Sequence, residues 1–360
     1  MFKSLISWIQ QNERHLGGVL FVGGFITDLL TFTLLDISIV NLLFAGYLIG
    51  AAVCVFGSHL AYTKGGEKPK LFLSTLRVVL PLAAQYLLGS LLSGFLIFYT
   101  KSSVVAVSWP FLVLIGLVFL GNEWFRKYRD RTVFLAVLLF FTLYAYSIFA
   151  LPLLVHELGP IVFLGSSVIS VAVFALFMFL LWRTGKTRLK ESLTPIIGSS
   201  LAIVIVVVVS YFIGLVPPIP LTLKEGNIYH AVSHTAEGYV VQTEASRMWW
   251  GLRSQVIHVA PGETLYAFTS IFAPIKFSTS TIHEWEHYDT EKNKWVTEGR
   301  VTFPISGGRA EGYRGYSERS SLAAGKWRVM VKTPSGQVIG RIPFVVEEVT
   351  TPPTLREETH

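Results

Sequence analysis

The sequence predicts a membrane all-α region of seven transmembrane helices followed by an extracytoplasmic all-β domain, an immunoglobulin-like sandwich. Two observations lead to this prediction. Long apolar stretches fill residues 17–216, and the basic residues between them fall almost entirely on alternate loops. The remainder of the chain is polar, aromatic and composed of short alternating runs, which are typical of strands.

The composition agrees with a membrane protein. The chain has 360 residues, of which 52% are hydrophobic and 15% charged, and its mean hydropathy is +0.54. These values lie outside the usual soluble range. The net charge is +7, but Lys and Arg cluster at the ends of apolar stretches, so we expect topology signals and no nucleic-acid partner. The single cysteine, Cys54, excludes an intrachain disulfide.

Residues 1–16 are predicted to form a short amphipathic cytoplasmic lead-in without a signal-peptide cleavage site. Seven apolar stretches follow, each close to the ~20 residues that a helix needs to cross a bilayer. Their predicted bounds are 17–35, 37–62, 76–98, 104–120, 133–155, 159–182 and 195–216.

Loop charges predict the direction of these spans. One set of loops contains Lys3, Arg14, Lys64, Lys68, Lys70, Arg77, Arg126, Lys127, Arg129, Arg131, Arg183, Lys186, Arg188 and Lys190. The other set contains only Lys101. The positive-inside rule therefore predicts a cytoplasmic N-terminus, and seven crossings place everything after residue 216 outside the cytoplasm.

Polar residues within the spans are candidates for function, because their burial in lipid is costly. They are Asp28, Asn41, His59, Gln85, Asn122 and Glu123. One interpretation is a proton or ion path that uses Asp28 and Glu123. The other, which we favour, is hydrogen bonding between helices, because these groups are scattered between the two membrane faces without a charged pair near the middle.

The C-terminal region begins with a proline-rich linker at 217–225, which we expect to be stiff and extended. A β-sandwich is predicted over 226–349, and the polar tail 350–360 is expected to be disordered. The predicted strands cover 239–243, 255–259, 264–272, 281–288, 301–305, 325–333 and 338–346.

The run His283-Glu284-Trp285-Glu286-His287 matches the zinc-protease pattern H-E-x-x-H. That chemistry requires both histidines on one face of a helix. The flanking residues favour a strand, where residues four apart lie ~13 Å from each other, too far for one ion. We therefore expect no metal and no cofactor.

Aromatic and arginine side chains in this domain could form a binding surface for sugars, peptides or acidic groups. The candidates are His283, Trp285, His287, Trp295, Arg309, Tyr313, Arg314, Tyr316 and Arg328. The alternative is that the aromatic residues belong to the core and that the arginines pair with Glu284 or Glu286 to tie strands together. The sequence leaves both open.

Several short motifs occur in a recognisable order. They include Ser108-Trp109-Pro110-Phe111, Leu215-x-Pro217-Pro218-x-Pro220, Ile282-His283-x-Trp285, Gly312-Tyr313-Arg314-Gly315-Tyr316 and Gly325-Lys326-Trp327-Arg328. In these motifs the chain resembles a family of bacterial polytopic membrane proteins with a C-terminal domain of unknown function 2914. The resemblance implies a protein of the bacterial inner membrane with a periplasmic β domain, and it supplies no catalytic residues.

Three functions are compatible with these features. The leading one is a non-enzymatic membrane protein whose outer domain binds a protein or glycan of the cell envelope. A transporter or ion-coupled permease is second, although no internal repeat supports it. A membrane-anchored hydrolase is third and rests on the disfavoured zinc motif. The oligomeric state stays open.

Overall fold

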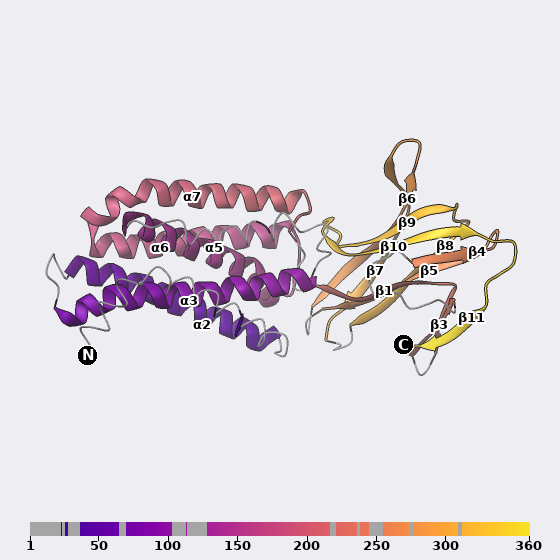
Figure 1. Ribbon diagram of the computed structural model, residues 1–360, viewed down its shortest axis with the longest axis horizontal. Helices are drawn as coiled ribbons and strands as arrows, with labels where there is room; N and C mark the ends of the chain where they lie inside the picture. The colour runs from indigo at the N-terminus through magenta and orange to yellow at the C-terminus, as the bar shows by residue number, and fades with distance from the viewer. Residues whose placement is uncertain are drawn as a thin grey trace. The chain divides into compact units, whose positions relative to one another are not determined.

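A computed structural model describes residues 23, 26–27, 37–64, 70–102, 113, 128–216, 221–235, 238–244, 255–273, 277–308 and 312–360. These residues form a helical unit and a β unit (Figure 1). The predicted lead-in 1–16 lies outside the described residues, as does nearly all of the predicted spans 17–35 and 104–120.

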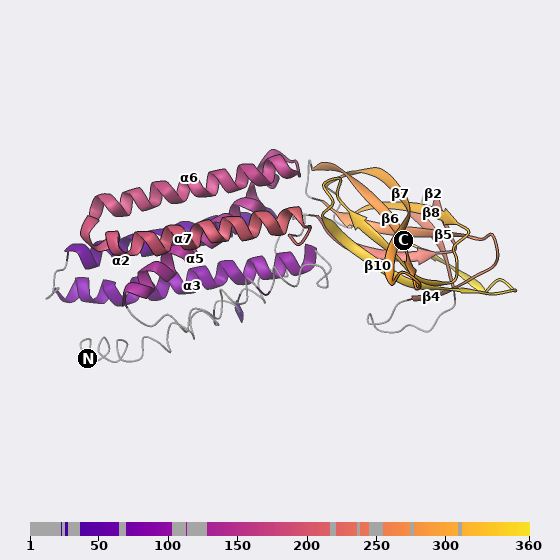
Figure 2. The same cartoon turned by 90° about the horizontal axis from the view of Figure 1, so that it is seen from above.

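The helical unit contains five long helices among its described residues, and they run side by side (Figures 1 and 2). They are α2 (Ile37–Lys64), α3 (Leu71–Ser102), α5 (Tyr128–Val155), α6 (Pro160–Thr184) and α7 (Lys186–Phe212). All five are long and apolar enough to cross a membrane. Five of the seven predicted spans therefore correspond to helices, and a count of seven is not supported.

Helix α5 is the centre of this unit. In an apolar stretch of 18 residues within α5, 72% of the residues are buried, whereas 22–33% are buried in the corresponding stretches of the other four helices. It packs against α2, α6 and α7, and the Tyr144 hydroxyl lies 2.7 Å from Ser167 Oγ on α6. The surrounding helices expose apolar side chains such as Leu42, Val168 and Leu201, as expected of surfaces that face lipid.

The β unit contains three sheets among its described residues. One has the order β1-β5-β8, the second β4-β10-β9-β6-β7, and the third β11-β3-β2. The strands are β1 (Thr222–Tyr229), β2 (Ala231–Thr235), β3 (Gly238–Glu244), β4 (Gln255–Val259), β5 (Thr264–Phe272), β6 (Ser278–Asp289), β7 (Lys294–Ser306), β8 (Tyr313–Ser320), β9 (Gly325–Lys332), β10 (Val338–Glu348) and β11 (Leu355–Thr359).

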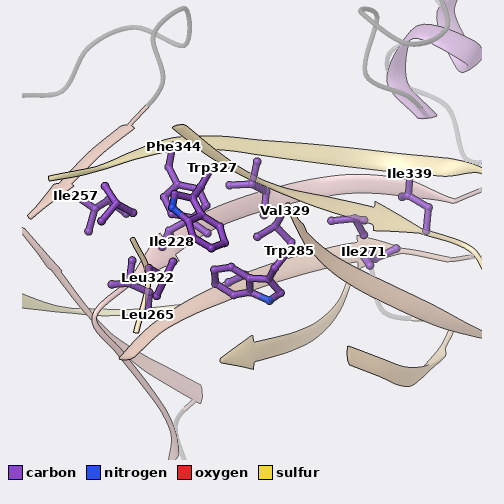
Figure 3. Close-up of a cluster of buried hydrophobic side chains, with 14 of the residues drawn as sticks. Ile228, Ile257, Leu265, Ile271, Trp285, Leu322, Trp327, Val329, Ile339 and Phe344 are labelled. Atoms are coloured by element: carbon purple, nitrogen blue, oxygen red, sulfur yellow. The ribbon is translucent and has the colours of Figure 1, made fainter. Parts of the chain in front are cut away.

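The first two sheets form a sandwich around one apolar core. Trp285 and Trp327 from the five-stranded sheet lie in the same buried cluster as Leu265 and Ile271 from the three-stranded sheet (Figure 3). The order β10-β9-β6-β7 corresponds to G-F-C-C′ of immunoglobulin-like sandwiches, and β5 with β8 corresponds to B and E. All seven predicted strands are present.

Two predicted boundaries are wrong. Strand β1 begins at Thr222, inside the predicted linker 217–225. The tail 350–360, expected to be disordered, contains β11, which pairs antiparallel with β3. His360 extends this pairing, since it exchanges backbone hydrogen bonds of 2.8 and 3.0 Å with Tyr239. Paired backbone and the contact of the His360 ring with Phe268 hold the tail in place.

Candidate functional site

The candidate site is the surface of the five-stranded sheet that faces away from the core. Trp285 on β6, Trp327 on β9 and Phe344 on β10 point into the core. Side chains alternate along a strand, so their neighbours point the other way. We call this surface the outer face. It carries Glu284, Glu286 and Tyr288 from β6, Trp295 and Arg300 from β7, Lys326, Arg328 and Lys332 from β9, and Arg341 from β10.

Glu284 is the most enclosed charge on the outer face, with a side chain only 3% exposed. Its Oε1 accepts hydrogen bonds from Arg300 Nε at 2.7 Å and from the Thr297 hydroxyl at 3.1 Å. Its Oε2 accepts a hydrogen bond from Lys332. Burial raises the pKa of Glu284, but hydrogen bonds from Lys332 and Arg300 outweigh it, and the net pKa is lowered. The carboxylate therefore stays ionised.

Glu286 forms the second ion pair of the outer face. It accepts a hydrogen bond from Arg328 Nε, and Lys332 Nζ lies 3.9 Å from its other oxygen. The Arg328 guanidinium also lies over the Trp295 ring, 4.1 Å from its centre. Arg328 is thus held between a carboxylate and an aromatic ring, an arrangement that fixes a flexible side chain.

Aromatic rings gather where β6 and β7 approach their shared turn. The Tyr288 and Trp295 rings meet edge to face at 5.2 Å, and Lys326 Nζ lies 6.0 Å from the Tyr288 ring centre. Trp295 remains only partly buried. The outer face therefore combines ordered cations with partly exposed aromatic rings.

His283 and Trp285, two predicted binding residues, lie inside the core instead. His283 is fully buried, with Nδ1 2.9 Å from Ser317 Oγ and Nε2 3.0 Å from Thr269 Oγ1. Trp285 Nε1 donates to the same Ser317 hydroxyl at 3.0 Å. Burial lowers the pKa of His283 to about 3, so the imidazole is neutral.

The H-E-x-x-H run lies on strand β6, as the flanking residues predicted. His287 lies on β6 two residues after Trp285, on the same face of the strand. Its ring centre lies 4.7 Å from that of Trp327 on β9. Within the described part of the chain, no three His, Cys, Asp or Glu side chains are grouped so that they could hold a metal ion. The geometry of a zinc-protease helix is therefore missing from this segment.

The remaining predicted binding residues are distributed over other surfaces. Tyr313, Arg314 and Tyr316 belong to β8 in the three-stranded sheet. Tyr313 packs against the core, while Tyr316 is 40% exposed. Arg309 lies outside the described residues. Of the eight predicted residues that the structure describes, the outer face contains Trp295 and Arg328.

The polar residues predicted within the membrane do not form one described site. Asp28, Asn122 and Glu123 lie outside the described residues. Asn41 lies near the start of α2, and its Oδ1 is buried with no hydrogen-bond partner in the described part. His59 lies near the end of α2, against Gly185 before α7, and Gln85 is buried on α3.

Sequence reasoning missed a histidine–glutamate cluster beside the third sheet. Glu244, the last residue of β3, accepts hydrogen bonds from the His258 backbone N–H at 2.6 Å and lies 2.8 Å from His258 Nδ1. His230 contacts Glu244 at 3.1 Å and Glu263 at 2.6 Å. The four residues lie on strands of different sheets or in the connections between strands. Because they are far apart in the sequence, no local sequence pattern predicts that they meet.

Comparison with known proteins identifies one segment of the chain. Residues 278–346 match a family model. The family is described as "Protein of unknown function (DUF2914)". The resemblance inferred from sequence motifs is thus confirmed for this segment, which runs from the start of β6 into β10 and includes the strands that carry Glu284, Arg300, Arg328 and Arg341, but not β4. None of the curated proteins compared with the chain matches it.

Three solved structures align with the chain at low similarity. An immunoglobulin-like protein from Pseudomonas aeruginosa shares 11% identity over 35% of this chain and 96% of its own, with a TM-score of 0.22. A β-glucosidase from Kluyveromyces marxianus shares 8% over 38% and 15%, with a TM-score of 0.17. An alkylpurine DNA glycosylase from Pseudomonas fluorescens shares 8% over 84% and 99%, with a TM-score of 0.22. The strand order, rather than these alignments, is the basis for the fold.

Proposed function

We propose that this protein is a multi-pass protein of a bacterial inner membrane whose periplasmic β unit binds a component of the cell envelope. The binding surface in this proposal is the outer face. The observation that supports it is the fixed position of Arg328, between Glu286 and the partly exposed Trp295. Trp, Tyr and Arg are the residues most enriched in binding hot spots, and here a Trp and an Arg are held in place and partly exposed.

The membrane assignment is supported by the five apolar helices. The periplasmic placement rests on the distribution of Lys and Arg between alternate loops. A binding role is preferred to an enzymatic one because His283, the strongest catalytic candidate in the sequence, is enclosed in the core and neutral. The outer face presents charges and rings but has no nucleophile paired with a base among its described side chains.

Site-specific photo-crosslinking in cells tests this proposal. A photoreactive amino acid replaces Thr297, which is exposed beside the outer face, or Ser233 on β2, which is exposed elsewhere on the β unit. We expect a discrete adduct from position 297 that disappears when Trp295→Ala is added. Identical adducts from both positions, or an adduct indifferent to Trp295→Ala, would show that the outer face is not the binding surface.

A further inference from the structure

We infer that the outer face takes an acidic sugar chain, whose carboxylate or phosphate groups pair with the cationic side chains of β7, β9 and β10. This inference rests on the proposed function, because it names the class of ligand for the same surface.

Cationic side chains outnumber carboxylates on the outer face. On β6, β7, β9 and the Arg341 end of β10, five cationic side chains, Arg300, Lys326, Arg328, Lys332 and Arg341, share it with Glu284 and Glu286. A third carboxylate, Glu347, lies at the β4 edge of the face, where it pairs with His258. Glu284 and Glu286 are buried, at 3% and 8% exposure, beneath the longer cations. Their oxygens are occupied by Arg300, Thr297, Lys332 and Arg328. A ligand that approaches from solvent therefore meets cations first.

Two of these cations keep donors for a ligand. Arg300 uses Nε and one terminal nitrogen on Glu284, yet its side chain is 67% exposed. A guanidinium has five N–H donors in a flat fork that matches carboxylate and phosphate oxygens. Arg341 has an Nε atom that is buried without a hydrogen-bond partner among the described residues. An anion beside Arg341 would offset that cost.

The pairing register places these donors in one row across the sheet. Arg341 on β10 lies opposite Met330 on β9, Met330 lies opposite Glu284 on β6, and Glu284 lies opposite Arg300 on β7. Neighbouring strands are ~4.8 Å apart, so Arg341 and Arg300 are separated by about three strand spacings, ~14 Å. A polymer with repeated acidic groups can contact both ends of the row, whereas a single small anion can contact only one.

The aromatic end of the outer face favours sugar over a lipid surface. Partly exposed rings such as Trp295 and Tyr288 offer flat apolar area with polar edges, which suits the C–H faces of pyranose rings. Binding to a membrane surface also draws on large apolar side chains that enter the lipid. In the described part of the β unit, the exposed large apolar side chains are Val256, Val301 and Tyr316, and they are dispersed over three strands.

Binding to defined polymers tests the inference with the full-length protein in nanodiscs of zwitterionic phospholipid. The probes are polygalacturonate, uncharged dextran of similar length, and vesicles that contain phosphatidylglycerol. We expect binding of polygalacturonate, weakening steeply with added salt because exposed charges are screened, and no binding of dextran. Arg300→Gln with Arg341→Gln should weaken polygalacturonate binding by about tenfold, the usual effect of losing a charge-assisted hydrogen bond.

The matched control is Lys224→Gln with Arg356→Gln, which removes the same charge from exposed positions on β1 and β11. It should bind polygalacturonate as the unaltered protein does. If the Arg300/Arg341 variant loses its fold, Arg300→Gln with Lys326→Gln, both at exposed positions, replaces it.

Three outcomes overturn the inference: dextran binding as strong as polygalacturonate binding, equal weakening in the control, or binding to the anionic vesicles alone. A Trp295-dependent crosslink at position 297 without polygalacturonate binding would reject the acidic sugar and retain the proposed function. If neither the crosslink nor polygalacturonate binding is observed, the inference and the proposed function are both rejected.

Discussion

His283 lies within the sandwich and connects its two walls. It belongs to β6 of the five-stranded sheet, and its ring nitrogens contact Thr269 on β5 and Ser317 on β8 of the opposing sheet. A buried polar group that is fully hydrogen-bonded specifies how the two sheets align. In the sequence, His283 is one of the two histidines of the H-E-x-x-H pattern. Residue spacing does not reveal its partners, because the hydroxyls that contact it come from distant strands.

Protonation of His283 is expected to destabilise the β unit. Its pKa in the folded protein is about 3, below the ordinary value near 6.5. The unfolded chain therefore binds more protons between these values, and stability is fully present above about pH 6.5 and declines as the pH falls. The full loss is about 5 kcal/mol near pH 3. Hydrogen exchange of β6 amides should show that their protection falls steeply as the pH is lowered. His283→Gln should make this fall shallower, whereas His234→Gln, at an exposed position, should leave it unchanged.

Trp327 is a second residue with a measurable contribution. Its side chain is 2% exposed, lies in the core with Phe344, and donates from Nε1 to the Ala323 carbonyl at 2.8 Å. Trp327→Ala should destabilise the β unit by about 3–5 kcal/mol. Tyr316→Ala, at a position 40% exposed, should cost at most about 1 kcal/mol. Equal losses in thermal unfolding of the two variants would contradict the placement of Trp327.

At the scale of elements, the strands that the sequence patterns missed share one position in the sheets. The missed strands β1, β2, β8 and β11 are all sheet edges. Within β8 only Ser317 is buried, so the apolar alternation that predicts a strand is absent. The outer face was partly foreseen, as the pairing of arginines with Glu284 or Glu286. The other partners of these two carboxylates, Arg300 and Lys332, depend on the register between strands, which composition does not encode.

The junction between β3 and β4 is expected to depend on pH. The hydrogen bond to Glu244 raises the pKa of His258, although burial opposes it. Burial raises the pKa of Glu244, but hydrogen bonds from His258 and His230 outweigh it and lower the pKa overall. The His258 contribution is present below its ordinary pKa near 6.5 and is lost as the pH rises through the raised value. The Glu244 contribution is present above its ordinary pKa and is lost in acid.

Hydrogen exchange of β3 amides, corrected for intrinsic rates, should therefore show greater protection at pH 6 than at pH 9. The variant His258→Gln should remove this difference. An unchanged difference in that variant would assign the pH dependence to another group.

At the scale of the whole molecule, the direction of the chain in the membrane follows from loop charge and is open to test. A reporter that is active only outside the cytoplasm, fused after His360, should be active. The same reporter inserted within residues 126–131, which hold four basic side chains, should be silent. The reverse pair of results would invert the topology and place the outer face in the cytoplasm.

The position of β10 also determines when the β unit can fold during synthesis. Although β10 is late in the chain, it lies between β4 and β9, and its pairing with β4 is parallel. It supplies Ile342, Phe344 and Val346 to the core. A nascent chain that ends before Val338 lacks an inner strand of the larger sheet, so β4 has no partner in that sheet and one edge of β9 stays unpaired. Such long-range pairing folds slowly and leaves strand edges open to aggregation until the last segment arrives.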